Sequence, residues 1–170
     1  MNNNKKISLL QIDSESELRD NIYQKQGILL GSEIENTRRY YMTEMNLYND
    51  NLSIGILSGG HGIDPQIKII DSRLIITSDQ MLYIFSVNQK TTTKVIECDS
   101  LIFDLIVHTN DKSVIVICEL DIKCITYEGD TKWSWQSDDT IIDYEINHDV
   151  INIVTEAEQQ HICLENGKLF

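Results

Sequence analysis

Several features that would fix the compartment or divide the chain are scarce in this sequence. One proline and eight glycines among 170 residues leave little room for a flexible linker, so we expect residues 1–170 to form a single domain. The longest unbroken apolar run, Val114–Cys118, is far too short to span a membrane. The opening MNNNKKISLLQID has two lysines but no apolar stretch of signal-peptide length, which predicts a cytoplasmic protein. In that compartment we expect four reduced cysteines, at Cys98, Cys118, Cys124 and Cys163.

Motifs that would name a reaction are also missing. The glycine-rich stretch 59–62 lacks the lysine and the spacing of a phosphate-binding loop, and no Gly-x-Ser-x-Gly or Cys-x-x-Cys is present. Cys118 and Cys124 straddle a predicted turn near Asp121, so we expect two small core thiols that face each other across a hairpin. None of the histidines pairs at a spacing of four, which favours structural roles for His61, His108, His148 and His161. We therefore predict no catalytic residue, no metal site and no cofactor.

Basic residues are scarce in the second half of the chain. Residues 97–170 carry 16 acidic and four basic side chains, whereas the first 96 residues carry 11 acidic and ten basic ones. The net charge of −13 is therefore concentrated after residue 96. An acidic half of this kind repels nucleic acid and anionic membranes, and it attracts basic protein partners.

A strand pattern that repeats dominates the chain from Gln66 onward. Segment 111–136 reads as three strands, with turns at 119–121 and 128–130. The stretch DSRLIITSD at 71–79 aligns with DKSVIVICE at 111–119, and then with DVINIVTE from Asp149. Each copy is preceded by one strand (66–70, 101–108 and 141–147) and followed by two more, although residues 168–170 only begin the last. The sequence therefore predicts four short antiparallel strands per repeat, with repeats at 66–100, 101–140 and 141–170.

The first 65 residues fit the repeat poorly. Residues 6–12 could form an edge strand, and Ser14 with Glu17 suits a capping box that opens a helix over 14–26, with Leu18, Ile22 and Tyr23 on its apolar face. Segment 38–47 could be strand or helix, and 52–57 reads as a strand before the 59–62 loop. This N-terminal segment would be either a degenerate blade or a cover for an exposed sheet edge.

The turn-and-strand sequences ITYEGDTKWSWQ and ICLENGKLF resemble the last hairpin in blades of β-propellers, of the quinoprotein or WD-like type. The resemblance covers residues 66–170 and implies an all-β fold of about three four-stranded antiparallel blades, with a less regular N-terminal segment. Because three blades cannot close a ring, we expect an open, half-propeller arc. The Trp-Asp dipeptide that closes many such blades is absent, and no quinone site is implied.

By size, charge and expected architecture, the chain also resembles the acidic immunity proteins of bacterial toxin–immunity systems. That resemblance implies a non-catalytic module that blocks a basic toxin domain such as a nuclease. The acids of segment 138–145 could also form a solvated face, or serve acid–base or metal chemistry. Aromatic anchors inside an acidic rim are typical of binding hot spots. We therefore predict a partner-binding set of Trp133, Trp135, Asp138, Asp139, Asp143, Tyr144 and Glu145.

Two other functions stay open from the sequence. One is a small-ligand or metal-dependent enzyme that uses the acidic mouth of the arc. The other is a propeller-like subunit of a larger assembly, held by pairing of edge strands.

Overall fold

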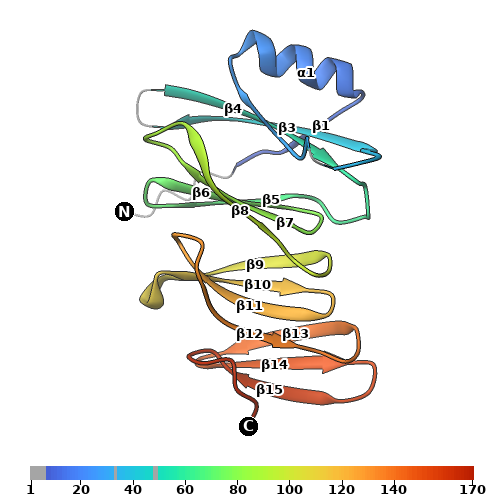
Figure 1. The fold of residues 1–170 in the computed structure, drawn as a ribbon, viewed down its shortest axis with the longest axis vertical. Helices are drawn as coiled ribbons and strands as arrows, with labels where there is room; N and C mark the ends of the chain where they lie inside the picture. The colour runs from blue at the N-terminus through green and yellow to red at the C-terminus, as the bar shows by residue number, and fades with distance from the viewer. Residues whose placement is uncertain (1–6, 33, 48–49) are drawn as a thin grey trace. The chain divides into compact units, whose positions relative to one another are not determined.

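The computed structural model describes residues 7–32, 34–47 and 50–170, and the chain falls into two compact units, residues 1–67 and residues 68–170. Both units are built mainly from antiparallel sheet, so the predicted all-β fold is confirmed (Figure 1). In the described residues, no helix is both long and apolar enough to cross a bilayer.

Unit 1 is a mixed sheet with one helix packed on it. Its elements are β1 (Leu10–Ile12), α1 (Glu15–Gln24), β2 (Ile28–Leu30), β3 (Arg39–Leu47) and β4 (Asp50–Ser58). The strand order is β1-β3-β4-β2, with β2 parallel to β4 and the other pairs antiparallel. Segment 38–47, which the sequence left open between strand and helix, is therefore a strand. The predicted edge strand is confirmed at Leu10–Ile12, while Lys6 lies outside the described residues.

The helix of unit 1 begins where its capping sequence predicts. The Ser14 side chain accepts a hydrogen bond from the backbone N–H of Glu17 at 3.2 Å. Leu18 and Ile22 are buried, as expected of its apolar face. Tyr23 was expected on that face but is 86% exposed, because one residue beyond Ile22 the helix has turned by about 100°.

A glycine allows this helix to lie close to the sheet. Leu18 and Ile22 pack with Met42 and Leu57 in one apolar cluster. A Cβ atom at Gly55 would lie 2.8 Å from Cγ1 of Ile22 and 3.1 Å from Cδ1 of Leu18. The missing side chain therefore sets the close approach of helix and sheet.

Unit 2 contains three sheets of consecutive antiparallel strands, which we call blades 1, 2 and 3 (Figure 1). Blade 1 consists of β5 (Gln66–Ile70), β6 (Arg73–Ser78), β7 (Met81–Ser86) and β8 (Thr91–Glu97), and the boundary between the two units falls within β5. Blade 2 consists of β9 (Ile102–His108), β10 (Ser113–Cys118), β11 (Asp121–Thr126) and β12 (Thr131–Gln136), with a short 3₁₀ turn η1 (Thr109–Asp111) after β9. Blade 3 consists of β13 (Ile141–Asn147), β14 (Val150–Thr155) and β15 (Gln159–Cys163).

The blade pattern predicted from the repeat is confirmed, with a short last blade. Blades 1 and 2 have four strands each and blade 3 has three. The expected start of a fourth strand at Lys168 is present as one isolated bridge, in which Leu169 pairs with Ile162. The backbone N–H of Phe170 also donates to the carbonyl of His161 at 3.1 Å.

Two apolar cores hold successive blades together, and β10 contributes to both. Val114 and Val116 lie in the core shared with blade 1, whereas Ile115 and Ile117 lie in the core shared with blade 3. Side chains alternate between the two faces of a strand, so a run of six buried residues supplies both cores at once. This explains why the run is continuously apolar rather than alternating.

The third copy of the repeat is shifted by one residue from the alignment that the sequence suggests. In the alignment of the repeats by sequence, Asp149 corresponds to Asp111. In the structure, its equivalent in blade 2 is Lys112. The carbonyl of Lys112 accepts from the N–H of Tyr127 at 3.1 Å, and the carbonyl of Asp149 accepts from the N–H of Leu164 at 2.8 Å. The connection that contains the 3₁₀ turn has four residues between paired His108 and Ser113, whereas the equivalent connection in blade 3 has two between paired Asn147 and Val150. Because strands have a period of two, this one-residue shift exchanges the faces assigned to the third copy.

The expected pairing of Cys118 with Cys124 across a hairpin is wrong. Cys124 is opposite Ile115 in the sheet, and it lies in the core between blades 2 and 3. Cys118 lies in the core between blades 1 and 2, where its thiol forms a hydrogen bond with that of Cys98. The two cysteines lie on the two strands of one hairpin, whose register is set by the Ile117–Ile122 pair. In this register the side chains of Cys118 and Cys124 point to opposite faces of the sheet.

Candidate partner-binding surface

One end of the blades carries half of the acidic residues of unit 2. We define the acidic end as segments 79–80, 97–101, 119–121, 137–140 and 156–158, which are the loops at one end of the strands together with the residues that flank them. These segments contain nine acidic residues and no lysine or arginine. Seven of the nine are exposed or half-buried: Glu97, Asp99, Glu119, Asp138, Asp139, Glu156 and Glu158.

Backbone hydrogen bonds join these loops from blade to blade. The N–H of Ile102 donates to the carbonyl of Asp79 at 2.8 Å, and one repeat later the N–H of Ile141 donates to the carbonyl of Glu119 at 2.9 Å. Within blade 2, the N–H of Glu119 donates to the carbonyl of Leu101 at 2.9 Å, which connects the loop after β10 to the segment before β9. The acidic loops are thus held in place by the same contacts that connect the blades, which gives them a fixed arrangement.

A single lysine at the start of β11 compensates two of these carboxylates. The Lys123 ammonium lies 3.0 Å from Oδ2 of Asp99 and 3.2 Å from Oδ2 of Asp121. Burial opposes the charge on Lys123, but the hydrogen bond to Asp99 and the attraction of Asp121 raise its pKa above the ordinary value. The Asp121 side chain is only 4% exposed and also accepts from the Ser100 hydroxyl at 3.0 Å. This ion pair therefore supports the loops rather than neutralising the exposed acids around them.

The opposite end of the same blades is balanced in charge. Its turns, at 71–72, 87–90, 108–112, 127–130, 148–149 and 164–168, contain six acidic residues and three lysines. Two more cations join them from the strands: Arg73 pairs with Glu128 at 3.0 Å, and Lys132 pairs with Asp111. The two ends of the blades thus differ in charge although they belong to the same sheets.

The structure separates the seven predicted partner-binding residues into three places. Asp138 and Asp139 are exposed in the acidic end. Asp143 and Glu145 are exposed on β13, on the same face of the strand as predicted from their spacing. The three aromatic residues Trp133, Trp135 and Tyr144 belong to the core between blades 2 and 3.

Trp133 connects two blades instead of projecting into solvent. It is 8% exposed, and its Nε1–H donates to the carbonyl of Leu164 in the turn after β15 at 2.9 Å. A Cβ atom at Gly167 would lie 2.7 Å from Cε3 of the indole ring, so the turn rests directly on it. The equivalent turn of blade 2, between β11 and β12, comes similarly close to β8 of blade 1, because a Cβ atom at Gly129 would lie 2.7 Å from Cγ of Lys94. Burial removes Trp133 from the exposed surface, so the four acids are the fully exposed part of the predicted set, while Trp135 and Tyr144 are half-buried.

Tyr144 is held in the same core by an acid of blade 2. Its hydroxyl donates to Oδ2 of Asp104, and its ring packs with the apolar cluster between the blades. Burial, together with the hydrogen bond to Asp104, raises the pKa of Tyr144. The residue is therefore a structural link between blades 2 and 3.

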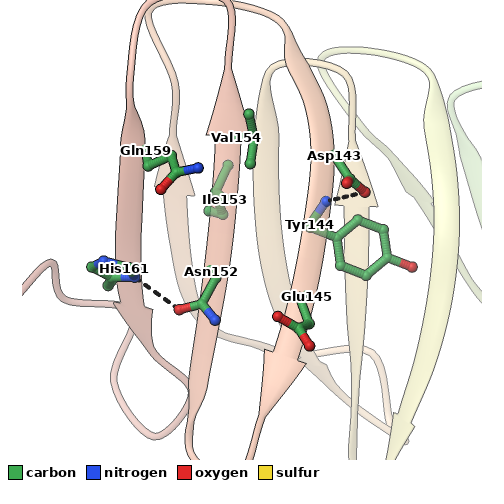
Figure 2. A pocket seen from close by; sticks show the side chains of 8 residues that line it. All are labelled: Asp143, Tyr144, Glu145, Asn152, Ile153, Val154, Gln159 and His161. Carbon is green, nitrogen blue, oxygen red and sulfur yellow. Dashed lines mark hydrogen bonds between the residues drawn. The ribbon is translucent and has the colours of Figure 1, made fainter.

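The outward face of blade 3 carries a hollow that sequence reasoning missed. We call this the terminal face; Figure 2 shows six of its side chains, which are Asp143, Glu145, Asn152, Val154, Gln159 and His161. Together with Tyr144 and Ile153 they line a hollow of about 250 Å³. In it Oδ1 of Asn152 lies 2.8 Å from Nδ1 of His161, and Oδ1 of Asp143 accepts from the N–H of Tyr144 at 2.8 Å. Only Asp143 and Glu145 could be predicted to share this face from their spacing in the sequence. The other residues could be assigned to it only once the register of the third copy had been corrected.

Within the described residues, the side chains form no group of three or more metal ligands. His108 ends β9 and His148 follows β13, near equivalent strand ends as the repeat suggests. No set of side chains on the terminal face combines a nucleophile with an adjacent base. The arrangement offers hydrogen-bond acceptors and negative charge, which suit recognition of a cation.

Comparison with protein-family models and with curated proteins finds no match. Among solved structures, the chain is similar to the dihydro-heme d1 dehydrogenase NirN in complex with DHE, with a TM-score of 0.56, 11% identity, and coverage of 77% of this chain and 31% of that one. It also matches BBS1N in complex with ARL6DN, with a TM-score of 0.49, 14% identity, and coverage of 77% and 48%. The chain thus spans less than half the length of both structures. At this identity the first likeness concerns the fold alone, and it supports open, propeller-like blades.

Proposed function

We propose that this chain is a non-catalytic binding module whose acidic end receives a basic protein. The observation that carries the proposal is the charge difference between the two ends of the same blades: the loop segments of one contain nine acids and no base, whereas the turns of the other contain six acids and three lysines. A one-sided field of this kind accelerates the encounter with a cationic partner and orients it before contact. The propeller-like fold supports an interaction or assembly role at a coarser level.

We further propose that the partner is a basic toxin domain such as a nuclease, which the chain would neutralise by covering its active site. A nuclease must attract a polyanion, so its active-site surface is cationic. A rigid row of carboxylates would compete for that surface without any chemistry of its own. This finer proposal has the support of charge and fold, and a direct assay of the captured partner tests it.

The experiment is capture of partners from a lysate of the organism that encodes the chain. The immobilised protein is tested beside an acidic-end variant with four charges removed, Asp138→Asn, Asp139→Asn, Glu156→Gln and Glu158→Gln. The matched control removes four charges at the opposite end, with Asp71→Asn, Asp130→Asn, Asp149→Asn and Glu165→Gln. All eight side chains are exposed, so both variants should keep the fold.

We expect a basic protein that binds the unmodified chain and the control variant, and that is lost from the acidic-end variant or at high salt. A nuclease activity in the captured protein that falls on addition of this chain would support the finer proposal. If only neutral or acidic proteins are captured, and equally well at high salt, the acidic end has no such role.

The alternative of a subunit in a larger assembly has one structural observation in its favour. Blade 3 has three strands where its neighbours have four, and the chain pairs with the outer edge of β15 through a single bridge. Part of that edge could therefore accept a strand from another protein. Sedimentation of the isolated chain distinguishes the two ideas, because self-association through this edge would give a concentration-dependent mass.

A further inference from the structure

The corrected register shows that the terminal face differs in kind from the equivalent face of blade 2. Ile115 and Ile117 of β10 face blade 3 from within an apolar core. Their counterparts on β14, counted from the equivalent turn hydrogen bonds, are Asn152 and Val154. Polar and apolar side chains thus alternate where blade 2 has only apolar ones.

The neighbouring strands show the same replacement. On β15, Gln159 takes the place of Ile122, and His161 takes that of Cys124. On β13, Glu145 takes the place of Ile106. Four apolar core positions of blade 2 have therefore become a carboxylate, two amides and an imidazole in blade 3. A further blade packed here in the same way would have to bury these groups, which is costly without partners for each. The face is suited to a polar occupant.

The hollow offers acceptors from two carboxylates, whereas the amides of Asn152 and Gln159 carry an acceptor oxygen and N–H donors. Oδ1 of Asn152 lies 2.8 Å from Nδ1 of His161, and a neutral ring in the tautomer that donates from Nδ1 keeps Nε2 as an acceptor. The two carboxylates lie along one side, on β13 (Figure 2). No lysine or arginine stands on β13, β14 or β15, so the negative charge is not compensated within these strands. Val154 supplies an apolar patch between the polar groups.

We propose that this hollow receives an arginine side chain of the basic partner. A guanidinium presents five donors in one plane and has weakly hydrated faces, which suits a shallow site with acceptors at its rim and a valine at its base. Asp143 and Glu145 provide the charge, while Gln159 and His161 accept from the far side. The terminal face continues from the acidic end, because Asp139 and Asp143 are separated by only three residues. The inference rests on the proposed function and locates one contact within it.

The test is an NMR titration of the ¹⁵N-labelled protein with N-acetylarginine methylamide. The neutral isostere N-acetylcitrulline methylamide is the control ligand. We expect saturable shifts of backbone amides at 143–145, 152–154 and 159–161 with arginine, and shifts at least roughly fivefold weaker with citrulline at the same concentration. Equal shifts with the two ligands would overturn the inference, and this comparison needs no variant.

Variants then locate the site. The double substitution Asp143→Asn and Glu145→Gln should weaken arginine binding by roughly fivefold or more, because both charges at the hollow are lost. The matched control, Asp138→Asn with Asp139→Asn, removes the same charge from the acidic end and should change the affinity less than about twofold. The amide spectra of the two variants report whether each remains folded.

The outcomes separate this inference from the proposed function. Arginine-dependent shifts confined to the acidic end would overturn the hollow as a site while leaving a cation-binding acidic end in place. Arginine binding in the hollow, together with capture of only acidic or neutral partners, would contradict the proposed function but retain the site. The absence of any arginine-dependent shift would overturn the inference.

Discussion

The contact between Gly167 and Trp133 gives the sharpest prediction about how the blades are joined. A Cβ atom at Gly167 would lie 2.7 Å from Cε3 and 2.8 Å from Cδ2 of the indole ring. Carbon atoms in favourable contact are about 3.5–4.0 Å apart. The ring is fixed by its hydrogen bond to Leu164 and by its burial, so it cannot move aside freely. Gly167→Ala should therefore destabilise the junction of blades 2 and 3.

Two contributions set the size of this effect. Gly167 has a φ of +72°, and an alanine in that conformation costs about 1–2 kcal/mol. Forcing an extra carbon into a packed contact costs about 1–3 kcal/mol more. We therefore expect the free energy of unfolding to fall by about 3 kcal/mol, which lowers Tm by about 6–12 °C in a chain of this size.

The matched control is Gly129→Ala in the preceding turn. Gly129 has a φ of +96°, and its added Cβ would lie 2.7 Å from Cγ of Lys94 and 3.1 Å from Cδ1 of buried Ile84, a terminal methyl that needs to shift by only a few tenths of an ångström. Lys94 is exposed and can swing away, so this substitution should cost mainly the backbone contribution of about 1–2 kcal/mol. Urea denaturation followed by tryptophan fluorescence measures both variants, since both tryptophans lie on β12.

A coupling measurement separates the two contributions. When Trp133→Leu has removed the ring, Gly167→Ala should cost only the backbone contribution, which gives a coupling energy of about 1–3 kcal/mol. Equal costs for Gly167→Ala and Gly129→Ala, with no coupling to residue 133, would refute the proposed docking of the turn on the indole.

Three further predictions test other parts of the structure. Leu18→Ala should lower the free energy of unfolding of unit 1 by about 2–5 kcal/mol, measured by urea titration with circular dichroism, and a loss under about 1 kcal/mol would contradict the burial of Leu18 between α1 and the sheet. Iodoacetamide at pH 8 should label half-buried Cys163 well before Cys118, because burial and the hydrogen bond to a neighbouring thiol raise the pKa of Cys118. Mass spectrometry that shows the reverse order of labelling would be inconsistent with these positions. Lys123→Met should cost about 3–5 kcal/mol at neutral pH because it leaves the Asp121 carboxylate buried without its cation. Since the pKa of Lys123 is raised on folding, its contribution is complete below the ordinary lysine value of about 10.4 and declines as the pH rises further, so the difference in stability between the two proteins should begin to narrow above about pH 10.4.

The strands of unit 2 could be predicted from the sequence because their signal is local. The β-branched run at Val114–Cys118 and the turn with Gly129 each specify their own backbone conformation, and the repeat confirms them at other positions. Ser14 and Glu17 predicted the start of the helix for the same reason. What the local pattern could not show was which core each face joins, since β10 is apolar on both faces.

The register of the third copy was missed because the connection from β9 to β10, which contains η1, is two residues longer than the connection from β13 to β14. The aligned aspartates at 111 and 149 favoured the wrong offset, and only the turn hydrogen bonds show that Lys112 is the true counterpart of Asp149. A one-residue shift exchanges faces, so the polar character of Asn152 and His161 on the terminal face was hidden.

The candidate surface was predicted in its charge but not in its composition. Asp138 and Asp139 were found because they follow a strand in an acidic segment, and their place in a loop at the end of the blades agrees with that pattern. Trp133 and Tyr144 were expected as anchors because aromatic residues are common in hot spots. Their burial depends on contacts with Leu164 and Asp104 in other parts of the chain, which no local pattern contains. The acid that closes the same strand in each repeat, at positions 79, 119 and 156, was the signal for the acidic end.

The most direct test of a cation-binding end is the association rate constant for the captured basic partner, measured by stopped flow at low salt with the acidic-end variant and its opposite-end control. The two variants have the same net charge, so a difference between them reports where the charge lies. We expect the acidic-end variant to associate at least about tenfold more slowly than the unmodified chain, and the control to change by less than about twofold. Equal slowing by both variants would contradict a localised docking surface.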